Sequence, residues 1–309
     1  MSEPIVYLNG AFVPESEAKV SVFDRCFLYG DGVFEGIAVW DRAPFRLGPH
    51  LDRLSRGLHY LMIEEPLDHN GWRRVLTELI ARNGMQDGYL RLQVSRGEGM
   101  SSIKWEKRLL KKPTPNVTVI PMAGFAQYYA GLFGRTDAQG LRAITVPRPR
   151  IASHAIPTGM KHCNYLGSVL GAIDVTGRGA DIGISVGTDG FVAEGIAYNV
   201  FCVAGGRLLT PPLTRDILPG ITRATIVELA AADGIPVQER DFDAYTLASA
   251  DEAFICSTLE LAVPVTEFDG RTIGTGRPGP LTLRIGALLK DAMVREAAEF
   301  HKATATTRE

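Results

Sequence analysis

Residues 160–165 read Met160-Lys161-His162-Cys163-Asn164-Tyr165, and an apolar helical pattern follows them. Lys161 is the sole lysine between residues 112 and 290. We predict a helix from about 162 to 177, because its apolar residues fall on one face. These residues are Leu166, Val169, Leu170 and Ile173. Tyr165 lies four residues after Lys161, which in a helix places both side chains on the same face.

Strands and helices alternate on both sides of this segment. Strands at 141–147 and 181–186 flank the helix, and a hairpin at 197–210 turns on Gly205-Gly206. A helix follows Leu218-Pro219-Gly220 and stops at Asp233-Gly234. The remaining elements predicted here are strands near 235–241, 252–257 and 262–268 and a helix from about 280. The mixture predicts an α/β (α+β) chain.

The N-terminal part has its own elements. Asn9-Gly10 predicts a hairpin over residues 5–13, and 68–82 is predicted to be a helix. An earlier helix carries the apolar stripe Leu47, Leu51, Leu54, Leu58 and Leu61. Strands are predicted at 89–94 and 116–120, and 123–140 has no periodic pattern. We therefore predict a small domain over 1–122, a linker over 123–140 and a larger domain over 141–309.

Composition excludes several function classes. The 309 residues are 45% apolar and 22% charged with a net charge of −2, which is typical of a globular protein and argues against nucleic-acid binding. No run of apolar residues is long enough for a transmembrane helix, and no signal peptide is evident, so we expect a cytoplasmic protein. The four separated cysteines indicate reduced thiols, and the six scattered histidines give no metal-binding pattern. Gly183-Ile184-Ser185-Val186-Gly187 matches a hydrolase motif by coincidence, since no helix follows it.

Six ordered landmarks resemble the class IV (fold type IV) pyridoxal-phosphate aminotransferases, and they span most of the chain. They are 27–36 (FLYGDGVFEG), 50–54 (HLDRL), 160–165 (MKHCNY), 190–195 (GFVAEG), 218–223 (LPGITR) and 256–258 (CST). The resemblance implies a smaller N-terminal α+β domain, a larger C-terminal pseudo-barrel domain, pyridoxal 5′-phosphate as cofactor and a homodimer or higher homo-oligomer.

The resemblance also assigns roles to residues that bind the cofactor. Lys161 is implied as the Schiff-base lysine that moves the proton, and Tyr165 as the partner of the cofactor's phenolic oxygen. Glu194 is implied to keep the pyridine nitrogen protonated, because a nearby carboxylate favours the cation. The phosphate would be held by Arg53 and the start of a helix, where free N–H groups attract anions. The further cofactor-binding residues implied are Leu218, Ile221, Thr222, Ser257 and Thr258.

The substrate pocket is implied by the branched-chain members of the family. Tyr89 and Arg91 match their Tyr-x-Arg pair, and alternate residues of a strand face the same side. Phe34 and Tyr29 would line the pocket, and Leu259 would narrow it. No Arg-x-His pair typical of D-amino acid aminotransferases follows Arg91.

These residues favour a ping-pong transaminase that moves the amino group of a branched-chain L-amino acid to 2-oxoglutarate. The short spacing from Lys161 to Asn164, however, is similar to that of D-amino acid aminotransferases and aminodeoxychorismate lyases. Residues 257–260 (STLE) and 97–105 also depart from the branched-chain pattern. A D-amino acid or (R)-amine transaminase, an aminodeoxychorismate lyase and a non-catalytic scaffold therefore remain alternatives, in that order.

Overall fold

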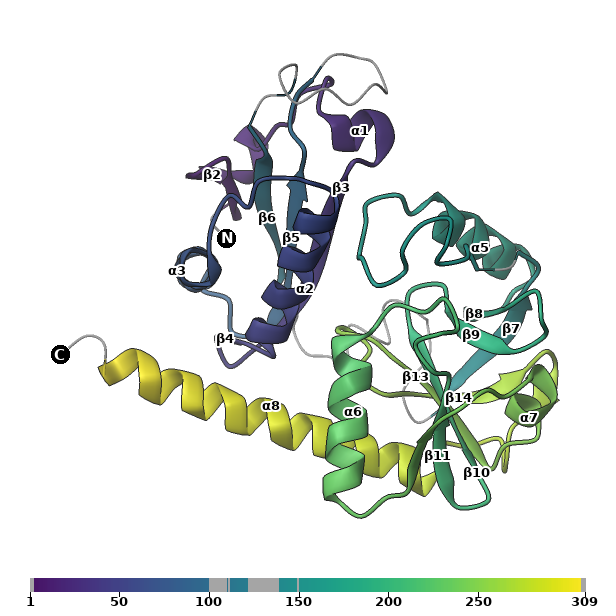
Figure 1. Cartoon of the computed structure of the whole chain (residues 1–309). Coiled ribbons are helices and arrows are strands. Elements are labelled where there is room, and N and C mark those ends of the chain that lie inside the picture. The colour runs from purple at the N-terminus through teal and green to yellow at the C-terminus, as the bar shows by residue number, and fades with distance from the viewer. Residues whose placement is uncertain (1–2, 100–109, 111, 122–138, 149, 307–309) are drawn as a thin grey trace. The chain divides into compact units, whose positions relative to one another are not determined.

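The chain forms two units in the computed structural model, which describes residues 3–99, 110, 112–121, 139–148 and 150–306 (Figure 1). Unit 1 comprises Met1–Ala123, Met160–Tyr165 and Met293–Glu309, and unit 2 comprises Gly124–Gly159 and Leu166–Ala292. The prediction of a mixed α/β chain in two parts is confirmed. The units differ from the predicted domains, because the chain returns to unit 1 at the lysine segment and again at its end. Of the predicted linker, residues 123–138 lie outside the described residues.

Unit 1 is an antiparallel sheet with helices on it. Its strands run in the order β2-β1-β6-β5-β3-β4. They are β1 (Ile5–Leu8), β2 (Ala11–Pro14), β3 (Gly32–Trp40), β4 (Ala43–Pro44), β5 (Gly88–Ser95) and β6 (Thr114–Pro121). Its helical segments are η1 (Glu15–Glu17), α1 (Arg25–Tyr29), α2 (Leu47–Tyr60) and α3 (His69–Arg82). The predicted hairpin is confirmed, with Asn9 and Gly10 at positive φ in its turn.

The leucine stripe explains how α2 packs on this sheet. Leu47, Leu51, Leu54 and Leu58 are all at most 4% exposed. They form one core with residues of β3 and β5 and with Trp72 and Leu76 of α3. In Figure 1, α2 runs alongside β3. The opposite alternate residues of β3 and β5 do not belong to this core, which leaves them available for a site.

Unit 2 is built on a nine-stranded mixed sheet in the order β12-β11-β10-β13-β14-β7-β8-β9, with β15 paired to β14. The strands are β7 (Leu141–Val146), β8 (Ile182–Val186), β9 (Val192–Gly195), β10 (Asn199–Ala204), β11 (Arg207–Thr210), β12 (Val237–Glu239), β13 (Glu252–Cys256), β14 (Val263–Phe268) and β15 (Arg271–Thr272). The helices are α5 (Leu166–Gly177), α6 (Ile221–Ala232), α7 (Ala244–Ala248) and α8 (Pro280–Thr306), the last of which continues into unit 1.

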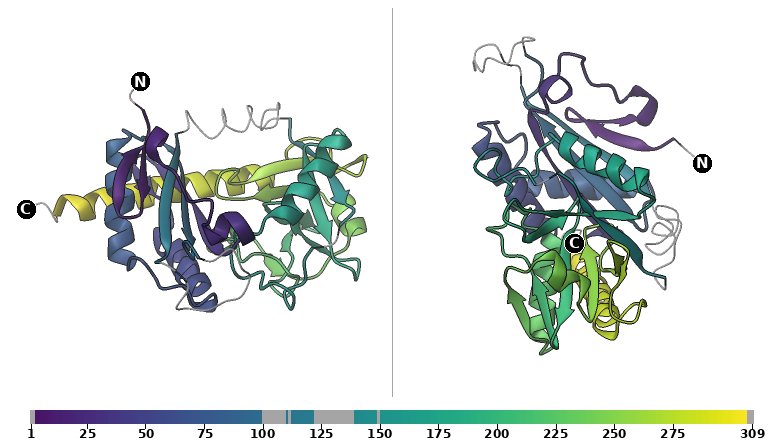
Figure 2. Two further views of the ribbon diagram at one scale, coloured as in Figure 1. Left: turned by 90° about the horizontal axis from the view of Figure 1, so that it is seen from above. Right: turned by 90° about the vertical axis from the view of Figure 1, so that its right-hand side faces the viewer.

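Both faces of the unit 2 sheet are buried. On β10, Val200 and Cys202 belong to one core and Phe201 and Val203 to the other, because successive side chains point to opposite faces. Phe201 stacks on Phe254 of β13, and α6 and the first turns of α8 cover that face (Figure 2). Ser185 lies inside β8, so the hydrolase-like motif is part of a strand.

The prediction for the helix after Lys161 was wrong in two respects. The helix begins at Leu166, four residues later than predicted, because residues 160–165 pair with a strand of unit 1 instead. Its predicted apolar face is largely exposed, since Leu166, Val169 and Ile173 are 64%, 51% and 61% exposed. Within the described residues, no helix has the length and apolar character to cross a membrane, and no cluster of acidic, His or Cys side chains suits a metal ion.

Candidate active site

Lys161 is held by strand-like pairing with β3. The Phe34 N–H donates to the Lys161 carbonyl at 2.9 Å, and the Cys163 N–H donates to the Gly32 carbonyl at 2.9 Å. Val33 and His162 form an antiparallel bridge between these two contacts. The segment is therefore extended rather than helical. Its hydrogen bonds to β3 hold the main chain at Lys161 and at Cys163.

Two aromatic rings surround the Lys161 amine. Its Nζ donates to the Tyr165 hydroxyl at 3.2 Å and lies 4.6 Å from the centre of the Phe34 ring. Phe34 and Tyr165 meet edge to face with their centres 5.3 Å apart. Lys161 and Tyr165 thus meet as the sequence suggested, but in a segment that pairs with β3 and turns between Cys163 and Tyr165, rather than through helical spacing.

Tyr89 and Arg91 lie on the same face of unit 1 as Phe34. The Arg91 guanidinium lies 3.9 Å from the centre of the Phe34 ring and donates to Gln93 Oε1 at 3.3 and 3.2 Å. Tyr89 is hydrogen bonded to Arg91, and burial raises its pKa to about 12, so its phenol keeps its proton at neutral pH. A Cβ atom on Gly36 would lie 2.4 Å from the Tyr89 hydroxyl. The Tyr89 side chain can therefore occupy this place only because residue 36 is glycine.

Arg53 belongs to a buried charge cluster on the core side of β3. Glu35, only 1% exposed, accepts from Arg53 Nε at 2.7 Å and Arg53 Nη2 at 2.8 Å, and its other contact is His50 Nδ1 at 2.7 Å. Burial opposes the charge on Glu35, but Arg53 and His50 overcome this and lower its pKa to about 2. Burial lowers the pKa of His50, so its ring is neutral at pH 7.

Glu35 was not predicted to have a role, although its sequence context carries a signal. Glu35 is the one ionisable residue in the apolar run Val33–Trp40. A carboxylate in such a run must be paired when buried. The nearest basic candidates on the following helix would then have been His50 and Arg53.

Tyr29 is more exposed than the residues described above. It ends α1, its ring lies 5.0 Å from the Arg25 guanidinium, and it is 37% exposed. Residues 97–105 depart from the branched-chain pattern in sequence, and residues 100–105 among them lie outside the described residues.

In unit 2, Glu194 is a buried and oriented carboxylate. It lies in β9 and is 4% exposed. Its Oε2 accepts from Asn199 Nδ2 at 3.1 Å and from the Leu218 N–H at 3.0 Å, and its Oε1 pairs with Arg150. Asn199 also donates to the Leu218 carbonyl at 3.1 Å, so one amide fixes both the carboxylate and the loop before α6. Asn199 and Arg150 were not singled out from the sequence.

The beginning of α6 is free of a side-chain cap. Gly220 is the N-cap and provides no side-chain bond, and the first N–H bonded within the helix is that of Ala224, to the Gly220 carbonyl at 2.9 Å. The N–H groups of Ile221 and Thr222 therefore have no acceptor inside the helix. A Cβ atom on Gly220 would lie 2.0 Å from Asn199 Oδ1, so glycine is needed where the loop meets Asn199.

Ser257 stabilises its own turn. Its hydroxyl donates to the Glu260 carboxylate and accepts from the N–H groups of Leu259 at 3.1 Å and Glu260 at 3.3 Å. Glu260 is thus directed back onto the turn. Thr258 and Leu259, between them, are half-buried.

Comparisons with known proteins identify the family of this chain. Residues 32–268 match the family model for amino-transferase class IV. A putative branched-chain-amino-acid aminotransferase from Methanocaldococcus jannaschii is 41% identical over 93% of this chain and 95% of its own length. The chain belongs to the class IV aminotransferases.

Two other relatives show the range of this family. A D-alanine aminotransferase from Bacillus licheniformis is 31% identical over 95% of this chain and 99% of its own length. The crystal structure of a branched-chain aminotransferase from Thermoproteus uzoniensis with norvaline superimposes with a TM-score of 0.85, covering 96% of each chain at 31% identity. This class IV aminotransferase therefore has the type IV fold and is a pyridoxal-phosphate-dependent enzyme.

Each unit, taken by itself, contains residue types that suit pyridoxal 5′-phosphate. Unit 1 supplies a primary amine on Lys161 beside the phenol of Tyr165. Unit 2 supplies the buried carboxylate of Glu194 and the uncapped N-terminus of α6, which suit a pyridinium nitrogen and a phosphate, respectively.

Proposed function

We propose that this class IV aminotransferase moves the amino group of a branched-chain L-amino acid to 2-oxoglutarate in a ping-pong reaction. The observation that carries the proposal is the placement of Lys161 and Arg91 against the same Phe34 ring, at 4.6 and 3.9 Å from its centre. An amino acid needs one group that handles its amine and another that binds its carboxylate. The apolar ring between these two groups suits an apolar side chain.

Lys161 is the proposed catalytic residue. Pyridoxal phosphate supplies an aldehyde that takes up the substrate's amino group and a ring that accepts electrons from Cα. Lys161 Nζ holds the cofactor between turnovers and moves the proton to and from Cα. The Tyr165 hydroxyl, 3.2 Å from Nζ, orients this amine and would bond the cofactor's phenolic oxygen.

The other proposed cofactor ligands act through charge. Glu194 would pair with the pyridine nitrogen and keep it protonated, with Asn199 and the Leu218 N–H holding the carboxylate in place. In unit 2, the Ile221 and Thr222 N–H groups are proposed phosphate ligands. In unit 1, Arg53, which Glu35 holds, is a further proposed phosphate ligand. Ser257 contributes by shaping the turn that presents Thr258 and Leu259.

Substrate binding is assigned to the face that carries Tyr89. Arg91 would release Gln93 to bind the carboxylate, and the protonated Tyr89 phenol would donate to it. Phe34 and Tyr29 are the proposed walls of the side-chain pocket in unit 1, and Leu259 is the proposed substrate-binding residue of unit 2.

The test is a titration of the pyridoxal-phosphate-loaded enzyme followed by absorbance. L-Leucine, D-alanine and (R)-1-phenylethylamine are added separately, and conversion of the cofactor to its amine form reports the first half-reaction. Conversion by L-leucine alone supports the proposal, and conversion by D-alanine or the amine alone refutes it. A Lys161→Ala variant should convert the cofactor with none of the three, and activity in that variant would refute the role of Lys161.

A D-amino acid transaminase is the second candidate. The D-alanine aminotransferase relative and the short spacing from Lys161 to Asn164 favour it. The same titration distinguishes the two, because the donor's configuration decides which way its Cα–H bond points toward Lys161.

We also propose that the enzyme acts as a homodimer in the cytoplasm. Helix α5 exposes the apolar side chains of Leu166, Val169 and Ile173 at 51–64%. Such clustering is typical of a surface that another subunit covers. Light scattering of the purified enzyme should give twice the 33.6 kDa of one chain, and a monomer at micromolar concentration would contradict this assembly.

A further inference from the structure

Two cysteines from distant parts of the sequence meet in unit 1. Cys26 lies in α1 and Cys163 in the segment that carries Lys161, and their thiols are hydrogen bonded to each other. Gly32 lies against both residues. Its carbonyl accepts from the Cys163 N–H at 2.9 Å, and a Cβ atom on it would lie 3.3 Å from Cys26 Sγ. The proposed transamination uses neither thiol.

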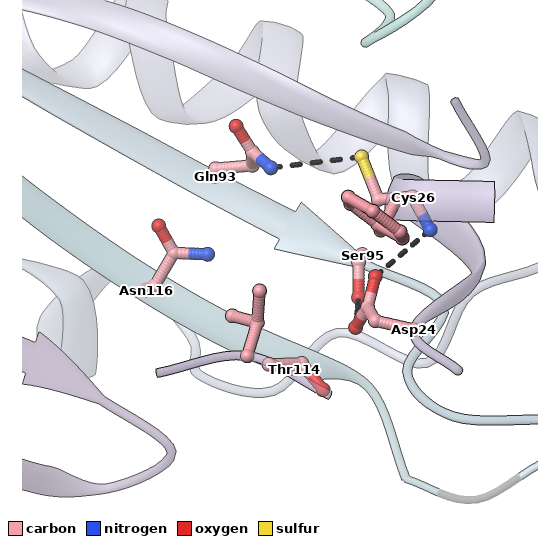
Figure 3. Close-up of a pocket in the computed structure, with 8 residues that line it drawn as sticks. Asp24, Cys26, Gln93, Ser95, Thr114 and Asn116 are labelled. Carbon is pink, nitrogen blue, oxygen red and sulfur yellow. Dashed lines mark hydrogen bonds between the residues drawn. The ribbon is translucent and has the colours of Figure 1, made fainter. Parts of the chain in front are cut away.

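A cavity gives small molecules access to Cys26. It has a volume of about 180 Å³ (Figure 3). Cys26 lines it together with the apolar side chains of Val20 and Phe27 and the polar side chains of Asp24, Gln93, Ser95, Thr114 and Asn116. Gln93 Nε2 points to the thiol and donates to Cys26 Sγ at 3.6 Å. The cavity wall therefore offers polar groups around a half-buried sulfur atom.

The two sulfur atoms differ in acidity. The hydrogen bond from Cys163 lowers the pKa of Cys26, helped by the positive charge of Arg91 and opposed by burial and by Asp24 and Asp31. The same hydrogen bond, together with burial, raises the pKa of Cys163. Cys26 is therefore the more acidic thiol of the pair and the one better suited to act as the nucleophile.

We propose that Cys26 and Cys163 form an oxidation site that a hydroperoxide converts to an intrachain disulfide. The Cys26 thiolate attacks the peroxide, so that an S–O bond forms, the O–O bond breaks and an alcohol or water leaves. The Cys163 sulfur then attacks the resulting sulfenic acid, forming the S–S bond and releasing water. Two thiols lose two electrons in total, and these electrons reduce the hydroperoxide.

The disulfide would tie the Lys161 segment to α1. Cys163 is two residues from Lys161, and the neighbouring Asn164 already packs against Gly30 at the end of α1, within 3.3 Å of a Cβ atom placed there. The oxidised enzyme therefore carries a covalent link between the catalytic segment and the α1 end of unit 1.

The experiment treats the pyridoxal-phosphate-loaded enzyme with hydrogen peroxide and then counts and maps thiols by mass spectrometry after alkylation. We expect the loss of two of the four thiols, a Cys26–Cys163 crosslinked peptide, and recovery of both thiols with dithiothreitol. Persistence of all four thiols at peroxide doses that oxidise glutathione, or a crosslink between any other pair, would overturn the proposal. This wild-type measurement decides the matter without requiring any variant to fold.

Single-residue variants then separate the role of Cys26 as the nucleophile from that of Cys163 as the second thiol of the disulfide. Cys163→Ser should stop at a sulfenic acid on Cys26 that dimedone traps, whereas Cys26→Ser should show no oxidised thiol at the same dose. Cys202→Ala is the matched control, because Cys202 is fully buried at 0% exposure, and it should form the disulfide as the wild type does. Dimedone labelling of Cys163 in Cys26→Ser would refute the assignment of Cys26 as the nucleophile.

Discussion

Replacing Glu35 by Gln should destabilise unit 1 far more than the removal of a carboxylate from a surface ion pair would. The Glu35 carboxylate is 1% exposed and is the partner of the Arg53 guanidinium, itself 4% exposed. A glutamine leaves that buried cation without a compensating charge, and breaking a buried pair costs about 3–5 kcal/mol. The pKa of Glu35 gives a similar magnitude, because a decrease from 4.5 to about 2 corresponds to roughly 3 kcal/mol.

The same pKa fixes the pH dependence of this effect. The folded pKa of Glu35 lies below its ordinary value of 4.5, so its contribution to stability is fully present above about pH 4.5. It is lost as the pH falls from 4.5 toward 2. The difference in unfolding free energy between wild type and Glu35→Gln should therefore be largest at neutral pH and smaller near pH 3.

The assay is urea unfolding of the cofactor-free protein followed by tryptophan fluorescence. It reports on unit 1, because all three tryptophans, at positions 40, 72 and 105, belong to its N-terminal segment. Glu78→Gln is the matched control, since Glu78 pairs with Arg82 on the surface at about half exposure and should cost only about 0.3–0.5 kcal/mol. If the two variants lost equal stability at pH 7, the argument from burial would be refuted.

Three further predictions concern packing. Gly36→Ala should displace the Tyr89 side chain, whose hydroxyl lies 2.4 Å from the added Cβ, and lower kcat/KM for L-leucine on the order of 10²-fold. Unchanged kinetics would contradict the role of that face. Gly220→Ala places a Cβ 2.0 Å from Asn199 Oδ1 and should weaken pyridoxal phosphate binding in an equilibrium titration, and unaltered affinity would show that the loop position is unimportant. Leu54→Ala, at 1% exposure, should cost about 2–5 kcal/mol in urea unfolding, and a loss below 1 kcal/mol would mean that the core collapses into the space.

Local patterns were sufficient to predict most elements of this chain. The leucine stripe of α2, the Asn9-Gly10 turn and the Gly205-Gly206 hairpin all lie where the sequence placed them. These features depend on side-chain period and on backbone angles of a few adjacent residues, so a short window contains the necessary information. The motif around Lys161 likewise indicates the aminotransferase family, because its residues are consecutive in the chain.

Only the tertiary structure decided what surrounds Lys161. The segment before Leu166 has a helical pattern, yet its main chain bonds to β3, more than 120 residues away in the sequence. Pairing of this kind leaves no period in a local window. The same holds for the thiol pair of Cys26 and Cys163 and for the cluster around Glu35, because buried charges and sulfur atoms find their partners through the fold. The sequence by itself determined the chemistry available to this protein, and the long-range pairing of its strands determined which of those groups meet.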